Sequence, residues 1–175
     1  ATVPALIVGF VVYEYLIIYL RSLIVIAWAS IIFGIILFIA DRKTDSNKTW
    51  EEISFFEAFI IGLCQTLAFI PGASRAGVTI TGARFFSVKR DSAAIFSMLL
   101  SIPIIIASLT LALIDVYSLD LAEVDFTKQI ISSFIAFVTA LLSINFMMKI
   151  LQKNNFNIFI VYRIILGFTL LLLYA

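Results

Sequence analysis

The sequence contains no histidine and only one cysteine among its 175 residues. Without histidine, the chain alone cannot form histidine-based metal sites or supply a histidine nucleophile or general base. Cys64 has no partner, so an intramolecular disulfide is excluded. We expect Cys64 to be a small core residue, since it lies within an apolar run.

Charged residues are also scarce, at 13% of the chain, whereas 63% of the residues are hydrophobic. The mean hydropathy is +1.15. A soluble domain needs more polar surface than this, so the composition predicts an all-α integral membrane protein. The net charge of +1 comes from charges in short loops and not from a basic stripe, so we expect no nucleic-acid partner.

Five apolar segments are long enough to cross a hydrocarbon core of about 30 Å at 1.5 Å per helical residue. They are residues 3–20, 22–40, 92–114, 128–150 and 157–174. We therefore predict about five transmembrane helices within a single transmembrane domain over residues 1–175. Ala1 is neither an initiator methionine nor part of a signal-like segment, so we expect the chain to be the C-terminal part of a longer protein.

Residues 55–86 form a further apolar segment, interrupted by Pro71-Gly72. Its second arm, residues 78–86, is only about 13 Å long as a helix and is too short to cross alone. Irregular backbone at membrane depth must be buried in protein or line a watery cavity. We therefore predict that residues 55–86 form a re-entrant helical hairpin.

The distribution of charge supports a hairpin that returns to its side of entry. Such a hairpin places all the basic loops on one face, which the positive-inside rule makes cytoplasmic. The loop over residues 115–126 is acidic and falls on the opposite face. A single crossing by residues 55–86 would break this pattern. The basic residues concerned are Arg42, Lys43, Lys48, Lys89, Arg90, Lys149 and Lys153.

The segment from Pro71 to Thr79 is where polar chemistry collects at membrane depth. Gly72 and Gly77 allow backbone conformations closed to other residues, so the N–H groups around Gly72, Ala73 and Gly77 can turn toward one anion. The helix that follows contributes the partial positive charge of its N-terminus. These three residues are therefore predicted to bind substrate.

Three side chains of this segment are candidate catalytic residues. Arg75 offers a full charge and a planar fork suited to phosphate oxygens, and the hydroxyls of Ser74 and Thr79 add two donors. Together they predict a phosphate cradle able to stabilise a phosphoryl transition state. The structural alternative is that Arg75 caps helix carbonyls or pairs with a carboxylate. With no histidine partner, Ser74 is expected to bind and not to attack.

Other polar residues have less specific interpretations. Gln65 precedes the turn by about two helical turns and is a candidate substrate-binding residue, although a helix–helix hydrogen bond explains it equally well. Arg84 and Glu57 lie toward the ends of the hairpin arms, where interfacial snorkelling is the favoured interpretation. Arg163 is expected to be an interfacial or packing charge, with a role in the site as the less favoured alternative.

The residues 62–70 (GLCQTLAFI), 71–80 (PGASRAGVTI) and 92–103 (SAAIFSMLLSIP) resemble the bacterial undecaprenyl pyrophosphate phosphatase family, the bacitracin-resistance phosphatases. The resemblance covers essentially the whole chain, and the central block is specific. It implies a multi-pass enzyme of the bacterial inner membrane that converts undecaprenyl diphosphate to the monophosphate carrier of peptidoglycan synthesis.

The resemblance also implies two inverted repeats, each with a re-entrant hairpin, and a site where the two meet. Arg75 would hold the diphosphate of the polyprenyl lipid, with Ser74 and Thr79 as hydrogen-bonding partners. A divalent cation, magnesium or calcium, is implied, with no metal ligands predicted in this chain. Membrane lipids are expected partners, and homo-oligomerisation is left open.

Two departures from the family pattern limit what the chain can do alone. Position 76 is Ala where the family often has a second Ser. The first-repeat motif, an E-x-x-x-E segment with a Ser-rich turn and a histidine, has no counterpart here. We therefore expect the chain to carry only the phosphate-stabilising half of the site. The alternative is a transporter or flippase for an anionic or lipid-phosphate substrate, because such proteins need the same cradle.

Overall fold

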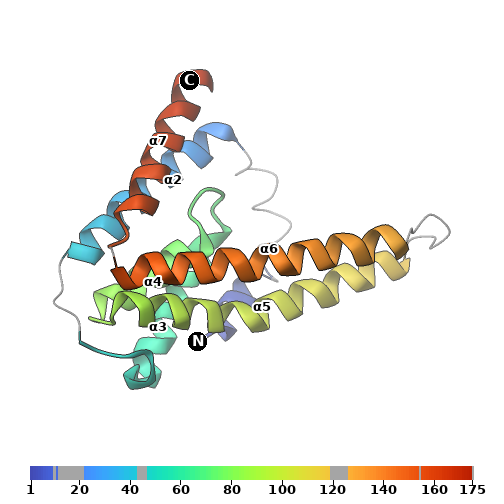
Figure 1. Cartoon of the computed structure of the whole chain (residues 1–175), viewed down its shortest axis with the longest axis horizontal. Helices are drawn as coiled ribbons and strands as arrows, with labels where there is room; N and C mark the ends of the chain where they lie inside the picture. Colours follow the sequence, from blue (N-terminus) through green and yellow to red (C-terminus); the bar gives the residue numbers. More distant parts are fainter. Residues whose placement is uncertain (10, 12–21, 43–46, 119–125, 154, 175) are drawn as a thin grey trace.

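The computed structural model describes residues 1–9, 11, 22–42, 47–118, 126–153 and 155–174. Over these residues the chain is helical, and it forms no named strand (Figure 1). The helices are α2 (Leu23–Arg42), α3 (Phe55–Thr66), α4 (Arg75–Phe85), α5 (Arg90–Ser118), α6 (Phe126–Lys153) and α7 (Asn157–Tyr174), with short 3-10 helices η1 (Trp50–Glu52) and η2 (Leu67–Phe69).

Four of these helices are long and apolar enough to cross a membrane: α2, α5, α6 and α7. They coincide with the last four predicted spans, and α7 matches residues 157–174 to the residue. The predicted first span, residues 3–20, lies largely outside the described residues. The all-α, multi-pass membrane architecture expected from hydropathy is therefore confirmed.

Two short helices, α3 and α4, occupy the predicted hairpin segment. They contain 12 and 11 residues, so each is only about 17–18 Å long and neither can span alone. At their base, the N–H of Lys89 donates to the carbonyl of Lys48 at 2.8 Å. The chain thus enters and leaves the hairpin at the same end, which is the geometry that a re-entrant segment requires.

The start of α3 is specified locally. Ser54 accepts a hydrogen bond from the Glu57 N–H, and the Glu57 carboxylate accepts one from the Ser54 N–H, which is a capping box. Lys48 also donates to that carboxylate at 2.6 Å, and this hydrogen bond is the main reason that the pKa of Glu57 is lowered. Glu57 therefore caps α3 at the base of the hairpin.

Helices α2 and α7 pack side by side (Figure 1), and α2 also packs against α4 of the hairpin. Their close approach depends on Gly167, where a Cβ would lie 2.5 Å from Ile31 Cγ1 and 2.8 Å from the Ala27 carbonyl oxygen. Small residues allow transmembrane backbones to approach in this way. Apolar side chains of α2, α3, α4, α5 and α7 then form the core, including Leu37, Ile61, Ile80, Ala93 and Ile160.

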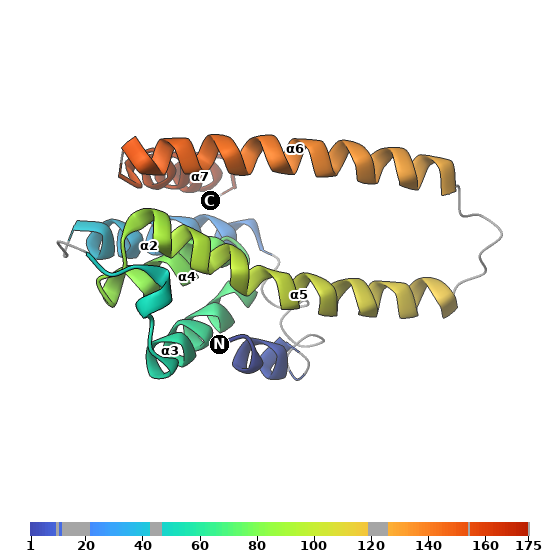
Figure 2. The same ribbon diagram turned by 60° about the horizontal axis from the view of Figure 1, so that its bottom comes forward.

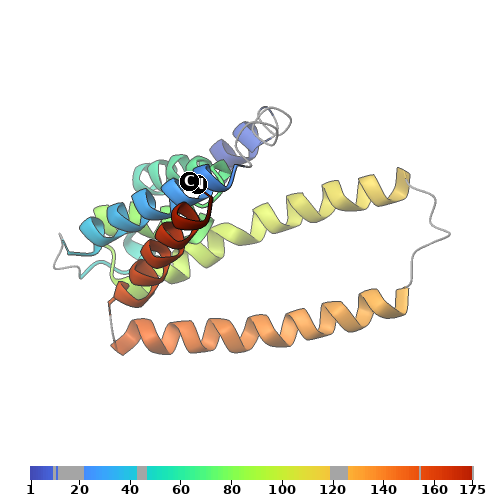
Figure 3. The same cartoon turned by 90° about the horizontal axis from the view of Figure 1, so that it is seen from above.

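Helices α5 and α6 extend well beyond this core (Figures 2 and 3). In their candidate spans only 11% and 0% of the residues are buried, against 39% in α2. Most of their apolar side chains therefore face outward. In a membrane this surface can contact lipid acyl chains without the cost it would incur in water.

A buried carboxylate ties four helices together at the base of the hairpin. Asp41, at the end of α2, forms ion pairs with Arg84 at 3.1 Å and with Arg90 at 2.8 Å. Its second oxygen accepts the N–H of Phe156, just before α7, at 3.5 Å. Arg84 also donates to the Asp41 and Val88 carbonyls. The interfacial interpretation of Arg84 is therefore wrong, because its side chain is only 1% exposed.

Replacing Asp41 by Asn should destabilise the protein by about 3–5 kcal/mol, because it leaves a buried guanidinium facing a neutral amide. The measurement is thermal unfolding in detergent. Lys48→Gln is the matched control, since its ion pair with Glu57 is partly exposed and should contribute only about 0–1 kcal/mol. Equal melting temperatures for the two variants would contradict the importance of the Asp41 cluster.

Candidate functional site at the tip of the hairpin

The turn between η2 and α4 has an unusual backbone. Gly72 has a φ of +91°, which other residues rarely adopt, and a Cβ there would lie 2.5 Å from the carbonyl oxygen of Ile26 in α2. Glycine is therefore needed at position 72 both for the conformation and for the close approach of α2. The turn is further closed by the Ala73 N–H, which donates to the Ile70 carbonyl at 3.0 Å.

Ser74 is the N-cap of α4 and is itself strained. Its φ of 67° and ψ of 115° lie outside the regions that L-residues favour. Its Oγ accepts the Gly77 N–H at 3.3 Å, and its carbonyl accepts the Val78 N–H at 3.0 Å. Because the Oγ accepts from the helix, its own O–H is available to donate elsewhere. Ser74 is also exposed, despite its place inside the helical array.

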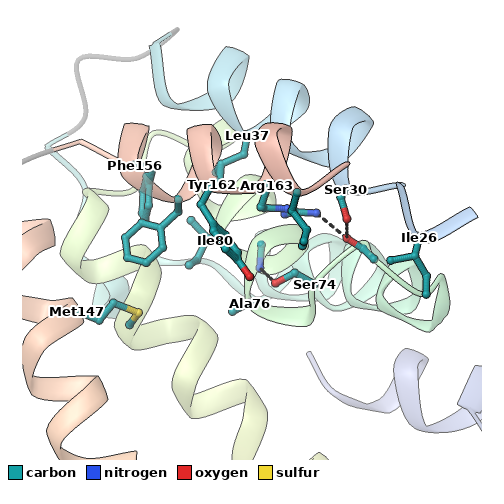
Figure 4. A pocket seen from close by; sticks show the side chains of 14 residues that line it. Ile26, Ser30, Leu37, Ser74, Ala76, Ile80, Met147, Phe156, Tyr162 and Arg163 are labelled. Atoms are coloured by element: carbon teal, nitrogen blue, oxygen red, sulfur yellow. Dashed lines mark hydrogen bonds between the residues drawn. The ribbon is translucent and has the colours of Figure 1, made fainter. Parts of the chain in front are cut away.

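A cavity of about 410 Å³ opens beside this turn (Figure 4). Its wall includes the exposed Ser74 together with Ser30 of α2 and Arg163 of α7. Most of the remaining wall is apolar. A polar end combined with an apolar remainder suits a ligand that has an anionic head and a hydrocarbon chain. The apolar lining residues are Ile26, Leu37, Ala76, Ile80, Met147, Phe156, Phe159 and Leu166.

Arg163 was expected to be interfacial or a packing charge, but it reaches the turn. Its side chain is buried, and Nη2 donates to the carbonyls of Gly72 at 2.8 Å and Ala73 at 2.7 Å. The interfacial prediction is therefore wrong. The signal in the sequence was that Arg163 is the one charged residue of α7, because an ionisable residue inside a span is a functional candidate by default.

The predicted catalytic residues are arranged around the first turn of α4. Arg75 begins the helix and is half-buried, and its guanidinium makes no hydrogen bond or ion pair within the described residues. Thr79 is buried, with its hydroxyl 3.0 Å from the Arg75 carbonyl oxygen and 2.7 Å from Ser97 Oγ of α5. Ser74 lines the cavity, whereas Arg75 and Thr79 do not.

The predicted substrate-binding residues divide in the same way. Gly72 and Gly77 line the cavity, while Ala73 is fully buried and presents its carbonyl to Arg163. Gln65 is 1% exposed and does not line the cavity, and neither atom of its amide has a hydrogen-bond partner. The helix–helix hydrogen bond considered for Gln65 is therefore not seen within the described residues, and its substrate-binding role stays a prediction.

Comparison with known proteins places this arrangement in a family. Residues 1–169 match the family model described as bacitracin resistance protein BacA. The chain belongs to the BacA family. A protein named undecaprenyl-diphosphatase from Ruegeria sp. (strain TM1040) is 41% identical over 98% of this chain and 64% of its own length. Proteins with the same name from Roseobacter denitrificans (strain ATCC 33942 / OCh 114) and Idiomarina loihiensis (strain ATCC BAA-735 / DSM 15497 / L2-TR) are 40% and 35% identical.

This BacA-family chain spans just under two thirds of the length of these relatives, at 64% and 65%. Within its described residues, no group of three or more histidine, cysteine, aspartate or glutamate side chains could hold a metal ion. The side chains that line the cavity include no carboxylate, the usual protein ligand of magnesium or calcium. What they do provide is a set of hydrogen-bond donors and positive charges.

The backbone at position 72 gives a test of the turn in this BacA-family chain. Gly72→Ala should lower the melting temperature and impair function, because a Cβ meets the backbone of α2 and a positive φ costs about 1–3 kcal/mol. Gly34→Ala is the matched control. Its Cβ would make ordinary contacts of 3.6 Å with Ile164 Cγ1, and alanine favours a helix by about 0.5–1 kcal/mol. Thermal unfolding that ranks the two variants in the opposite order would contradict this account.

Proposed function

We propose that this chain supplies the phosphate-binding part of a membrane phosphatase, which converts undecaprenyl diphosphate to undecaprenyl phosphate and inorganic phosphate. The name that the relatives share, undecaprenyl-diphosphatase, supports this activity. The proposed setting is the bacterial inner (plasma) membrane, where recycling of the lipid carrier serves peptidoglycan synthesis and its loss affects sensitivity to bacitracin. Undecaprenyl diphosphate and membrane lipids are the proposed partners.

The observation that carries this proposal is the polar end of the cavity. There the hydroxyl of Ser74 and the N-terminus of α4 meet an otherwise apolar space. The first N–H groups of a helix lack intrahelical partners and favour anions. A diphosphate head fits the donors, and the apolar wall fits the first part of a polyprenyl chain.

In the proposed mechanism these donors act on the terminal phosphate while water adds to its phosphorus and the P–O bond to the lipid monophosphate breaks. The Ser74 O–H and the N–H groups of Arg75 and Ala76, at the start of α4, donate to oxygens of the terminal phosphate. Arg75, which has no competing partner among the described residues, adds its charge from the same turn. As the bond to the leaving lipid monophosphate lengthens, these donors stabilise the negative charge that develops on the phosphate oxygens.

Thr79 supports this first turn and need not touch the ligand. Its hydroxyl lies within hydrogen-bonding distance of the carbonyls of Arg75 and Ala76 and of Ser97, so it links the start of α4 to α5. We propose that Thr79 holds the orientation of the turn that carries Ser74 and Arg75. Ala73 and Gln65, whose buried amide has no hydrogen-bond partner among the described residues, are also proposed as parts of the binding region.

The chain itself contains no histidine to activate water or protonate the leaving group. Acid–base chemistry is therefore assigned outside these residues. The magnesium or calcium ion that the family resemblance implies stays part of the proposal, but no step above depends on it. The proposed function is also compatible with a homo-oligomer. A transporter or flippase would use the same cradle, and no observation favours it over the phosphatase.

Arg75→Ala in the full-length protein should lower kcat for polyprenyl diphosphate hydrolysis about 10²- to 10³-fold, as does loss of one transition-state donor in other enzymes. Phosphate release from the detergent-solubilised enzyme is the measurement. Arg75→Lys should have a kcat between those of the wild type and Arg75→Ala, because it keeps the charge and loses the planar fork.

Lys149→Gln is the control, since it removes the same charge from an exposed position on α6. Its activity should match that of the wild type. If Arg75→Ala also released phosphate at the wild-type rate, the role assigned to Arg75 would be wrong.

A further inference from the structure

Only one of the two terminal nitrogens of Arg163 forms hydrogen bonds with the protein. Nη2 donates to the carbonyls of Gly72 and Ala73, whereas Nη1 is buried and has no hydrogen-bond partner. The residue is 8% exposed, so water gives Nη1 little compensation. Buried polar groups almost always have partners, and leaving a charged donor without one is costly. An unpaired N–H in this position therefore indicates a ligand.

The free end of the guanidinium lies at the first turn of α4. A Cβ built on Gly77 would be 2.5 Å from Arg163 Nη1 and 3.3 Å from Ser74 Oγ. Both polar atoms therefore border the same small space, which only a glycine at position 77 leaves open. Ser74, Gly77 and Arg163 all line the cavity, and Figure 4 shows Arg163 reaching from α7 toward the turn.

The turn beside this space has an excess of positive charge, although only Arg163 of its two arginines lines the cavity. Arg75 and Arg163 both lie at the turn, and neither takes part in the ion pairs found among the described residues. The carboxylates that do form ion pairs, Asp41 and Glu57, are engaged at the base of the hairpin by other cations. Two guanidinium groups without a carboxylate, one of them buried, strongly favour a multiply charged anion beside them.

We propose that Arg163 is a second phosphate-binding residue, whose Nη1 donates to a phosphate oxygen of the ligand while Nη2 holds the turn in place. This inference rests on the proposed function for the identity of the ligand, but only the phosphate group is needed for the contact. The planar fork is essential to it, because one side chain must satisfy two backbone carbonyls and the ligand at once.

The test uses the full-length protein in detergent with two probes, inorganic pyrophosphate and farnesyl diphosphate. Arg163→Met should weaken the binding of both by roughly 30-fold or more, as expected when one partner of a buried charged contact is truncated. Arg163→Lys should weaken both by roughly 10-fold, since an ammonium keeps the charge but cannot reach all three acceptors. Lys149→Gln should leave both dissociation constants unchanged.

Melting temperatures with and without pyrophosphate separate binding from support of the turn. Loss of the carbonyl contacts should lower the melting temperature of both Arg163 variants without ligand, while loss of the phosphate contact should also shrink the rise that pyrophosphate causes. A full pyrophosphate-induced rise in a destabilised variant would overturn the proposal. If Arg163→Met does not fold, Arg163→Lys and its roughly 10-fold loss decide the matter.

The outcomes also distinguish this inference from the proposed function. If the wild type binds pyrophosphate but hydrolyses no polyprenyl diphosphate, the proposed function fails and the Arg163 contact is still judged by binding. If the wild type is active and the Arg163 variants bind both probes with dissociation constants within threefold of those of the wild type, the Arg163 contact is refuted while the proposed function stands. Weakening confined to farnesyl diphosphate would also refute it, because the contact would then be to the chain and not to phosphate.

Discussion

The structure depends on satisfying the backbone of a turn that lies among membrane helices. A helix break leaves carbonyl and N–H groups that lipid cannot hydrogen-bond, so protein groups must do so. Here the Arg163 side chain of α7 donates hydrogen bonds to the carbonyls of Gly72 and Ala73, and the Ser30 hydroxyl of α2 also donates to the Gly72 carbonyl. The close packing of α2 against α7 brings these two donors to the turn. The strained Ser74 and the start of α4 are held in place as a result.

Two buried arginines thus hold the hairpin at its two ends, but their electrostatic surroundings differ. Arg84, at the base, faces Asp41 and is neutralised by it, so its role is structural. Arg163, at the tip, contacts only carbonyl dipoles on one side and has no carboxylate beside it among the described residues. The same residue type therefore fixes the fold at one end, where its charge is compensated, and can bind an anion at the other, where it is not.

The sequence predicts most of the architecture because the information is local. Hydropathy and length define the spans α2, α5, α6 and α7, and Pro71-Gly72 with a short second arm defines the hairpin. The interfacial interpretations of Arg84 and Arg163 were wrong because their partners, Asp41 and the turn carbonyls, are 43 and about 90 residues away in the chain. The periodicity of hydrophobic residues along a helix does not predict contacts between residues so far apart in the sequence. Thr79 illustrates the same limit, since only the packing of α5 reveals Ser97 as its partner.

The separation of binding from acid–base chemistry follows from the same arrangement. A turn with two guanidinium groups and helix N–H donors stabilises a bound phosphate. A carboxylate placed among these donors would pair with the guanidinium groups and weaken phosphate binding. Groups that activate water are thus better supplied from a different element that faces the turn across the ligand. Among the described residues the charges at this turn are all positive, which fits the binding side of the proposed active site and leaves its acid–base groups to a second side.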